Sequence, residues 1–237
     1  KRLLPIGRRA DGSLVSVPPY GPNILIAGPS GSGKSTLTAG IVERLMAQAY
    51  QLCIIDPKGD YGTQPDVLTL GHQFHAVSVN EVMAFLEDPK ITLNVNLLGI
   101  ALADRPEFFG HLFPNLQAMR TRTGRPHWII LDEAHHLLPA QWSHLGRALP
   151  HSLGETIFVT LYPDHLAPLV LAQIDVLIAV GPGPRETIQK FADSIGEPLT
   201  WPTGLEFQKG RAVVWFWRTG EAPFAIEVLP GRAERIR

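Results

Sequence analysis

One segment of the chain has the residue types and the spacing of a phosphate-binding loop. Residues 28–35 read GPSGSGKS, which satisfies the pattern G-x-x-x-x-G-K-[ST]. Glycines let the backbone turn so that several N–H groups point at one anion, and the N-terminus of a following helix adds partial positive charge. We therefore predict that this loop binds the phosphates of a nucleoside triphosphate. The predicted contacts come from Gly28, Ser30, Gly31, Ser32, Gly33, Lys34, Ser35 and Thr36.

Two side chains of the loop have more specific predicted roles. Lys34 would neutralise charge on the β- and γ-phosphates and is a candidate catalytic residue, and the Ser35 hydroxyl would be a ligand of Mg²⁺. The alternative is a chance Gly/Ser-rich loop. An apolar run at 23–28 and a helical pattern at 35–49 flank the loop, as a phosphate loop requires, and argue against that alternative.

A pair of carboxylates follows another apolar run, at residues 128–131. In a hydrolytic site, Asp132 would hold Mg²⁺ through water, and Glu133 would polarise the attacking water. Such a pair can instead be a helix N-cap and a first-turn acid, so this alternative stays open. Glu133 directly after Asp132 favours hydrolysis over phosphate transfer to a small molecule, because a kinase needs no water activator.

Short apolar runs alternate with helical patterns along most of the chain, which predicts an α/β fold with a mainly parallel sheet and helices on both faces. We expect a lead-in at 1–22, a P-loop core at 23–200, and a C-terminal β hairpin at 201–237 that belongs to the same domain. Strands are expected at 23–28, 51–57, 128–136, 155–160 and 176–180, with weaker ones at 67–70, 75–79 and 92–95. Helices are expected at 35–49, 81–87, 105–122, 166–173 and 185–195.

Thr160 is a further candidate catalytic residue. In P-loop ATPases with an adjacent catalytic glutamate, the strand after the acidic pair lies between the two motif strands, and its polar end faces the γ-phosphate. Thr160 ends the run 155–160 and is the predicted γ-phosphate sensor. The alternative is a threonine that only begins a loop.

The order of three motifs resembles the HerA/FtsK-type P-loop ATPases, which include the coupling and VirB4-like ATPases of conjugation and secretion. The motifs are NILIAGPSGSGKS, IIDPKGDY and WIILDEAHHLLP, and the resemblance covers residues 20–195. Many ATPases share the first and third motifs. The turn at 56–61 is therefore the motif that narrows the resemblance to this family. The resemblance implies a RecA-like fold, Mg²⁺-dependent ATP hydrolysis, a hexameric ring, and movement of DNA or another substrate.

The chain departs from this family at two points. The family usually has Gln at the end of the sensor strand, where this chain has Thr160 followed by Leu161. No arginine finger can be assigned. Arg147, Arg185 and Arg211 are candidates, and a solvated surface role is the alternative for each.

The amino-acid composition restricts the classes of protein to which the chain can belong. The 237 residues are 45% hydrophobic and 18% charged, which is typical of a globular chain, and the net charge of −1 supports no global electrostatic hold on DNA. One cysteine excludes an intrachain disulfide and favours a cytoplasmic location, and no apolar run is long enough for a membrane span.

The histidines at 135, 136, 144, 151 and 165 match no standard zinc spacing, so Mg²⁺ is the only metal predicted. Lys58 is expected on a solvated face, and His135 on a helix face near the nucleotide.

The favoured function is a Mg²⁺-dependent ATPase domain of a DNA-processing or translocating motor, with ATP and DNA as partners. The alternative is an ATP-binding regulatory module of a larger multidomain enzyme, with slow, DNA-independent turnover. A GTPase is disfavoured because the chain contains no N-K-x-D motif.

Overall fold

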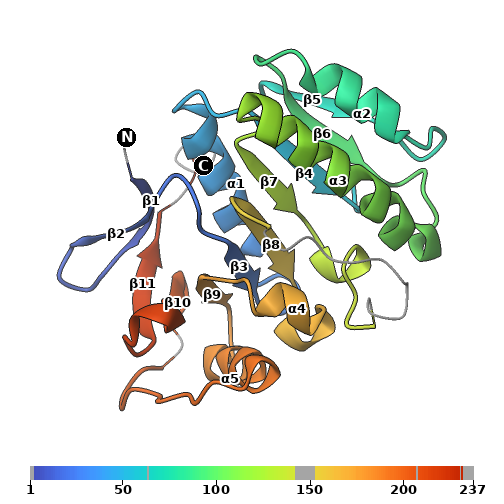
Figure 1. The fold of residues 1–237 in the computed structure, drawn as a ribbon. Helices are drawn as coiled ribbons and strands as arrows, with labels where there is room; N and C mark the ends of the chain where they lie inside the picture. The colour runs from blue at the N-terminus through green and yellow to red at the C-terminus, as the bar shows by residue number, and fades with distance from the viewer. Residues whose placement is uncertain (1–2, 63, 142–152, 207, 230, 232–237) are drawn as a thin grey trace.

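The computed structural model describes residues 3–62, 64–141, 153–206, 208–229 and 231. Its strands form one eleven-stranded sheet in the order β2-β1-β11-β10-β9-β3-β8-β7-β4-β6-β5 (Figure 1). The strands are β1 (Leu4–Arg8), β2 (Leu14–Val17), β3 (Ile24–Ala27), β4 (Leu52–Asp56), β5 (Val67–Leu70), β6 (Thr92–Asn96), β7 (Trp128–Leu131), β8 (Thr156–Thr160), β9 (Val176–Val180), β10 (Arg211–Trp215) and β11 (Phe224–Val228).

The middle of the sheet is a parallel block that carries the predicted motifs. β3, β8, β7 and β4 are neighbours, and every residue in these four strands is buried. Burial on both faces explains why their sequences read as continuous apolar runs. β8 lies between β3 and β7, which confirms the predicted insertion of the later strand between the two motif strands.

The sheet is mixed beyond this block. β9, β6 and β5 continue the parallel arrangement, whereas β10 pairs antiparallel with β9 and β11, and β1 pairs antiparallel with β11 and β2. The predicted C-terminal hairpin is therefore confirmed and belongs to the same sheet. The predicted lead-in contributes β1 and β2, for which no strands were expected. Pro5 and Gly7 hide the alternation of β1, and an added Cβ at Gly7 would lie 2.5 Å from the Ile226 side chain.

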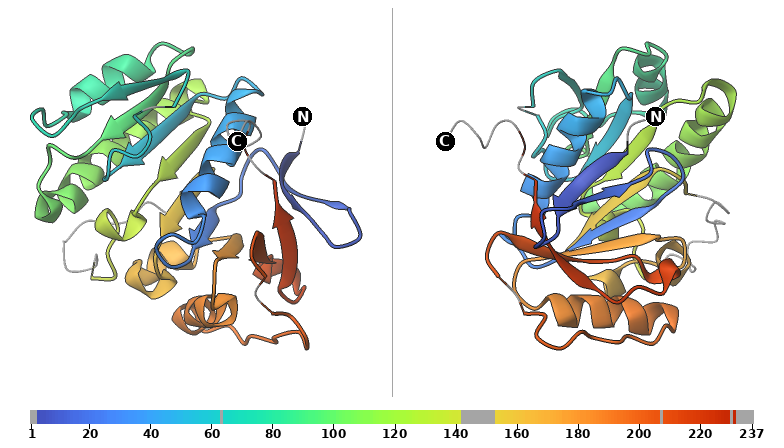
Figure 2. Two further views of the ribbon diagram at one scale, coloured as in Figure 1. Left: turned by 180° about the vertical axis from the view of Figure 1, so that it is seen from behind. Right: turned by 90° about the vertical axis from the view of Figure 1, so that its left-hand side faces the viewer.

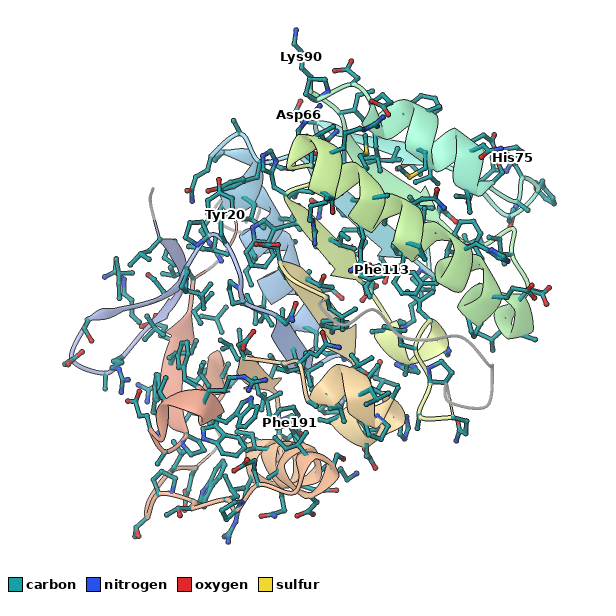
Figure 3. The ribbon with its side chains drawn as sticks, in the orientation of Figure 1. Tyr20, Asp66, His75, Lys90, Phe113 and Phe191 are labelled. Atoms are coloured by element: carbon teal, nitrogen blue, oxygen red, sulfur yellow. The ribbon has the colours of Figure 1, made fainter. Side chains whose placement is uncertain are left out.

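Helices cover both faces of the sheet, as the sequence predicts (Figure 2). α1 (Lys34–Met46) packs on one face through Leu37, Ile41 and Leu45, and the other helices pack on the opposite face. Phe113 of α3 and Phe191 of α5, labelled in Figure 3, are buried on that opposite face. The other helices are α2 (Val79–Leu86), α3 (Arg105–Thr123), α4 (Pro168–Leu171) and α5 (Pro184–Ile195). Among the described residues, no helix is both long and apolar enough to cross a membrane.

Two local features differ from a simple sequence-based expectation. The strand predicted at 75–79 is wrong, because Ser78 instead caps α2 in a capping box with Glu81.

Gly40 lies inside α1, where glycine is unfavourable by about 1 kcal/mol relative to alanine. An added Cβ there would lie 3.2 Å from the Gly231 backbone nitrogen and 3.3 Å from the Leu229 carbonyl oxygen. The close passage of the C-terminal segment therefore accounts for the glycine.

Candidate nucleotide-binding site

Four segments meet at the carboxyl edge of the parallel block. They are the loop between β3 and α1, the turn at 56–61 after β4, the acidic pair after β7, and Thr160 at the end of β8. Carboxyl ends of neighbouring parallel strands open at the same edge, which is where α/β sheets bind ligands. The predicted site residues, far apart in sequence, are brought to this edge by strand order alone.

The phosphate loop is shaped by its glycines. Gly31 and Gly33 have φ of 72° and 97°, a left-handed conformation that residues with a Cβ adopt at a cost. Gly28 is needed for another reason, since an added Cβ would overlap the carbonyl oxygen of Val180 at the end of β9. The loop therefore passes directly over the neighbouring strand, and its path requires glycine at these positions.

The polar side chains of the loop are arranged around its interior. Lys34 Nζ donates to the carbonyl oxygens of Gly28 at 2.8 Å and Pro29 at 2.9 Å. Burial lowers the pKa of Lys34, and the negative charges of Glu133 and Asp132 oppose that shift. The Ser32 hydroxyl is buried and has no hydrogen-bond partner among the described residues. An ammonium group and an unsatisfied hydroxyl in one loop fit an anionic ligand.

The acidic pair is almost completely buried, with exposed fractions of 4% for Asp132 and 5% for Glu133. Burial, together with the neighbouring charges of Glu133 and Asp56, raises the pKa of Asp132 to about 7. A bound cation would relieve this repulsion among carboxylates. Glu133 has a φ of 43° and precedes a short 3₁₀ helix, η2 (Ala134–His136), without making a side-chain capping hydrogen bond. Glu133 therefore occupies the N-cap position of η2, but its side chain does not cap the helix.

Glu133 lies in a chain of polar contacts that the sequence did not predict. Its Oε1 pairs with Lys58, and its Oε2 lies 3.3 Å from His135 Nε2. His135 Nδ1 lies 3.0 Å from Thr160 Oγ1, whose hydroxyl donates to the Tyr162 carbonyl oxygen at 3.2 Å. Lys58, expected on a solvated face, is half-exposed and bound to Glu133. His135 bridges Glu133 and Thr160, a closer involvement than a helix face near the nucleotide implies.

Asp56 explains why Lys58 reaches Glu133. The Asp56 side chain is fully buried, and its Oδ1 accepts hydrogen bonds from the backbone N–H groups of Lys58, Gly59 and Asp60, at 3.1, 2.7 and 3.2 Å. Its Oδ2 accepts a further bond from the Tyr61 N–H at 3.0 Å. One carboxylate therefore holds the whole turn in shape. The turn follows β4, and β4 pairs with β7, so the sheet brings Lys58 close to Glu133.

The remaining candidates lie away from these contacts. Arg185 at the start of α5 and Arg211 at the start of β10 are exposed, and Arg147 is outside the described residues. A pocket of about 870 Å³ lies between α1 and the segments around Asp66 and Lys90, next to where β5 and β6 begin. It contains none of the predicted site residues.

Comparisons with known proteins agree with this fold. The family described as helicase HerA, central domain, matches residues 21–103. Among solved structures, VirB4 of Thermoanaerobacter pseudethanolicus has a TM-score of 0.63 at 12% identity, covering 98% of each chain. The genome packaging NTPase B204 of Sulfolobus turreted icosahedral virus 2, in complex with ATP-gammaS, has a TM-score of 0.57 at 17% identity, covering 89% of this chain and 99% of that one.

A third similar structure is the cytoplasmic domain of the type VII secretion ATPase EccC of Thermomonospora curvata. It has a TM-score of 0.56 at 18% identity, and the match covers 95% of this chain and 28% of that one. At such identities, structural likeness shows a common fold. Among curated proteins, none matches the sequence. The family match over residues 21–103 and the shared α/β fold together confirm the resemblance of this chain to the HerA/FtsK-type P-loop ATPases.

Proposed function

We propose that this domain binds ATP with Mg²⁺ along residues 28–36 and hydrolyses it as part of a motor that moves DNA. One observation carries the proposal. The glycine-shaped loop, the buried Asp132 and the strand-end Glu133 lie at one edge of the parallel block. That arrangement supports the proposal that an anion site, a cation ligand and a base for water lie next to one another.

The residues at this edge fit the proposed ligands. Lys34 now donates to carbonyl oxygens of its own loop, and charged phosphate oxygens are stronger acceptors than these carbonyls. The unpartnered Ser32 hydroxyl can donate to the same ligand. Ser35 and Asp132 would hold Mg²⁺, which would offset negative charge on the phosphate oxygens. An ionised Asp132 is then favoured, because the cation opposes the effects that raise its pKa.

Glu133 is the proposed general base. Its carboxylate is held on one side by Lys58 and on the other by His135, which in turn contacts Thr160. We assign to Glu133 the orientation and polarisation of the attacking water. Thr160 is a positioning residue in this scheme, since its hydroxyl reaches Glu133 only through His135.

The choice of DNA as the moved substrate rests on the similar structures. B204 is named a genome packaging NTPase and a DNA-packaging ATPase, and TcpA, with a TM-score of 0.54, is named a conjugation coupling protein. These names describe those proteins, and the shared fold supports extending DNA movement to this chain. A ring of several copies and a cytoplasmic location are part of the same proposal.

The test is the ATPase rate in the presence of Mg²⁺, with and without double-stranded DNA. We expect hydrolysis that DNA stimulates, and we expect Lys34→Ala to abolish it, because the variant loses the charge facing the phosphates. The matched control is Lys90→Ala, which removes an exposed lysine at a site remote from the loop (Figure 3). ATP binding with slow turnover that DNA leaves unchanged would contradict the motor and support the regulatory module.

A further inference from the structure

A second group of potential metal ligands lies beside the proposed catalytic edge. Glu133, His135 and His136 each offer a ligand atom, and these three atoms all lie within 4.8 Å of one another. Glu133 is buried, and the two histidines are partly buried. The standard zinc spacings could not reveal this group, because its members come from a strand end and the single turn of η2.

Hydrogen bonding determines which nitrogen of His135 carries the proton. The Thr160 hydroxyl has one hydrogen, which it donates to the Tyr162 carbonyl oxygen at 3.2 Å. The contact at 3.0 Å between Thr160 Oγ1 and His135 Nδ1 therefore needs a hydrogen on Nδ1. A neutral ring protonated at Nδ1 has only a lone pair at Nε2.

This lone pair faces another acceptor. His135 Nε2 lies 3.3 Å from Glu133 Oε2, while the other carboxylate oxygen is bound to Lys58. Two acceptors without a hydrogen between them repel each other, and a cation between them would remove that repulsion. Two ligand atoms on a tetrahedral zinc ion, each about 2.0–2.1 Å from the metal, lie about 3.3–3.4 Å apart. The observed separation matches this value.

We propose that Glu133, His135 and His136 form a binding site for a divalent transition metal of the Zn²⁺ type, with water as the fourth ligand. Two imidazole nitrogens and one carboxylate oxygen favour Zn²⁺ over Mg²⁺, which prefers oxygen ligands. The backbone N–H of His136 donates to the Glu133 carbonyl oxygen at 2.8 Å, but its ring has no hydrogen-bond partner among the described residues and is available. The Thr160 hydroxyl orients His135 as an outer-sphere partner of the metal, in the way that ligating histidines commonly require.

The site would compete with hydrolysis. A metal bound to Glu133 takes the carboxylate that we assign to the attacking water, so Zn²⁺ would inhibit ATP turnover. This consequence rests on the proposed function, whereas metal binding itself does not. Lys58 is half-exposed and can move into solvent when the metal's charge arrives.

The test is calorimetric titration of the full, untagged, nucleotide-free chain with zinc chloride, and absorption spectroscopy with Co²⁺. We expect one zinc ion per chain and a Co²⁺ spectrum of tetrahedral type. His136→Gln and His135→Gln should each weaken Zn²⁺ binding by at least about tenfold. Two variants serve as controls. Asp132→Asn removes the proposed Mg²⁺ ligand, and His75→Gln removes an exposed histidine outside the group. Both should bind Zn²⁺ like the unaltered chain.

Unchanged Zn²⁺ affinity in His136→Gln would overturn the site, as would lost affinity in Asp132→Asn or His75→Gln. The His136 variant keeps the test valid if His135→Gln does not fold, which circular dichroism would show. Inhibition is measured separately, as the ATPase rate at saturating Mg²⁺ with added Zn²⁺, relative to each variant's own zinc-free rate. Zinc binding without inhibition would contradict the role of Glu133 in hydrolysis and leave the metal site standing.

Discussion

Glu133 is the single residue on which the proposed hydrolysis depends most directly. Its φ of 43° lies in the left-handed region, which costs a residue with a Cβ of order 1–3 kcal/mol. Such strain is commonly retained where it aims a functional group. Here it coincides with the carboxylate's contacts to Lys58 and His135.

The first prediction concerns this carboxylate. Glu133→Gln should keep ATP affinity within a few-fold and lower the turnover number by about 10²–10⁴, because glutamine cannot accept a proton from water. The measurement is single-turnover hydrolysis alongside fluorescent-nucleotide binding. Glu186→Gln, which changes an exposed acid on α5, is the matched control. A variant with near-normal turnover would remove Glu133 from its assigned role.

At the scale of elements, the strands were more predictable than the side-chain network. Buried parallel strands are continuous apolar runs, so β3, β4, β7, β8 and β9 could be located from sequence. β1 and β2 are short, and β1 is interrupted by Pro5 and Gly7, which removes the alternation that identifies such a strand. The position of β8 between β3 and β7 followed from the motifs, because in P-loop ATPases with an adjacent catalytic glutamate the later strand lies between the two motif strands.

The polar chain through Lys58 and His135 was not predictable in the same way. It depends on where side chains point after strand ends, and two local conformations decide that. One is the turn folded around Asp56, and the other is the left-handed backbone at Glu133. Neither has a periodic signal in the sequence. From sequence, the motif at 56–61 indicated only a resemblance to a family. The structure adds its physical role, which is to position Lys58 beside Glu133.

The turn at 56–61 gives the second prediction. Asp56→Ala should lower the free energy of unfolding by about 3–5 kcal/mol, because it removes a buried carboxylate that accepts four backbone hydrogen bonds. It should also release Lys58 from its position beside Glu133. Urea denaturation measures the first effect, and limited proteolysis within the turn measures the second. Asp60→Ala, at an exposed position of the same turn, should change either by little. Equal stability of the two variants would show that Asp56 does not hold the turn.

For the whole molecule, a partly buried histidine makes the fold sensitive to acid. His127 accepts a hydrogen bond from the Gln51 N–H at 2.9 Å, and burial, with the charges of Arg125 and Arg120, lowers its pKa below 6.5. The unfolded chain then takes up this proton near pH 6.5, while the folded chain does not. Stability from His127 is therefore present above that pH and is lost as the pH falls below it.

The third prediction follows from this linkage. Between about pH 7 and about pH 5.5, the unaltered chain should lose more free energy of unfolding than His127→Asn. Asparagine can still accept the Gln51 hydrogen bond but does not titrate. Urea midpoints across the pH range give the comparison, with His72→Asn, an exposed histidine, as the control that should follow the unaltered chain. Parallel curves for His127→Asn and the unaltered chain would contradict the assignment.

The last prediction concerns assembly. Among the described residues, no arginine forms a hydrogen bond or ion pair with residues 28–36. We expect a second copy of the chain to supply the arginine whose positive charge stabilises the transition state. Specific ATPase activity should therefore rise with protein concentration and reach a plateau. Mixing two variants gives a sharper readout. The Lys34→Ala chain cannot hydrolyse ATP, but its arginines can complete the site of a neighbouring copy. If Arg185 or Arg211 is the arginine finger, its alanine variant should be inactive alone and should regain ATPase activity when mixed with Lys34→Ala. Mixing Lys34→Ala with Lys90→Ala should not raise the ATPase activity. Specific activity that stays flat on dilution, with no recovery in either mixture, would mean that one copy of the chain completes the site alone.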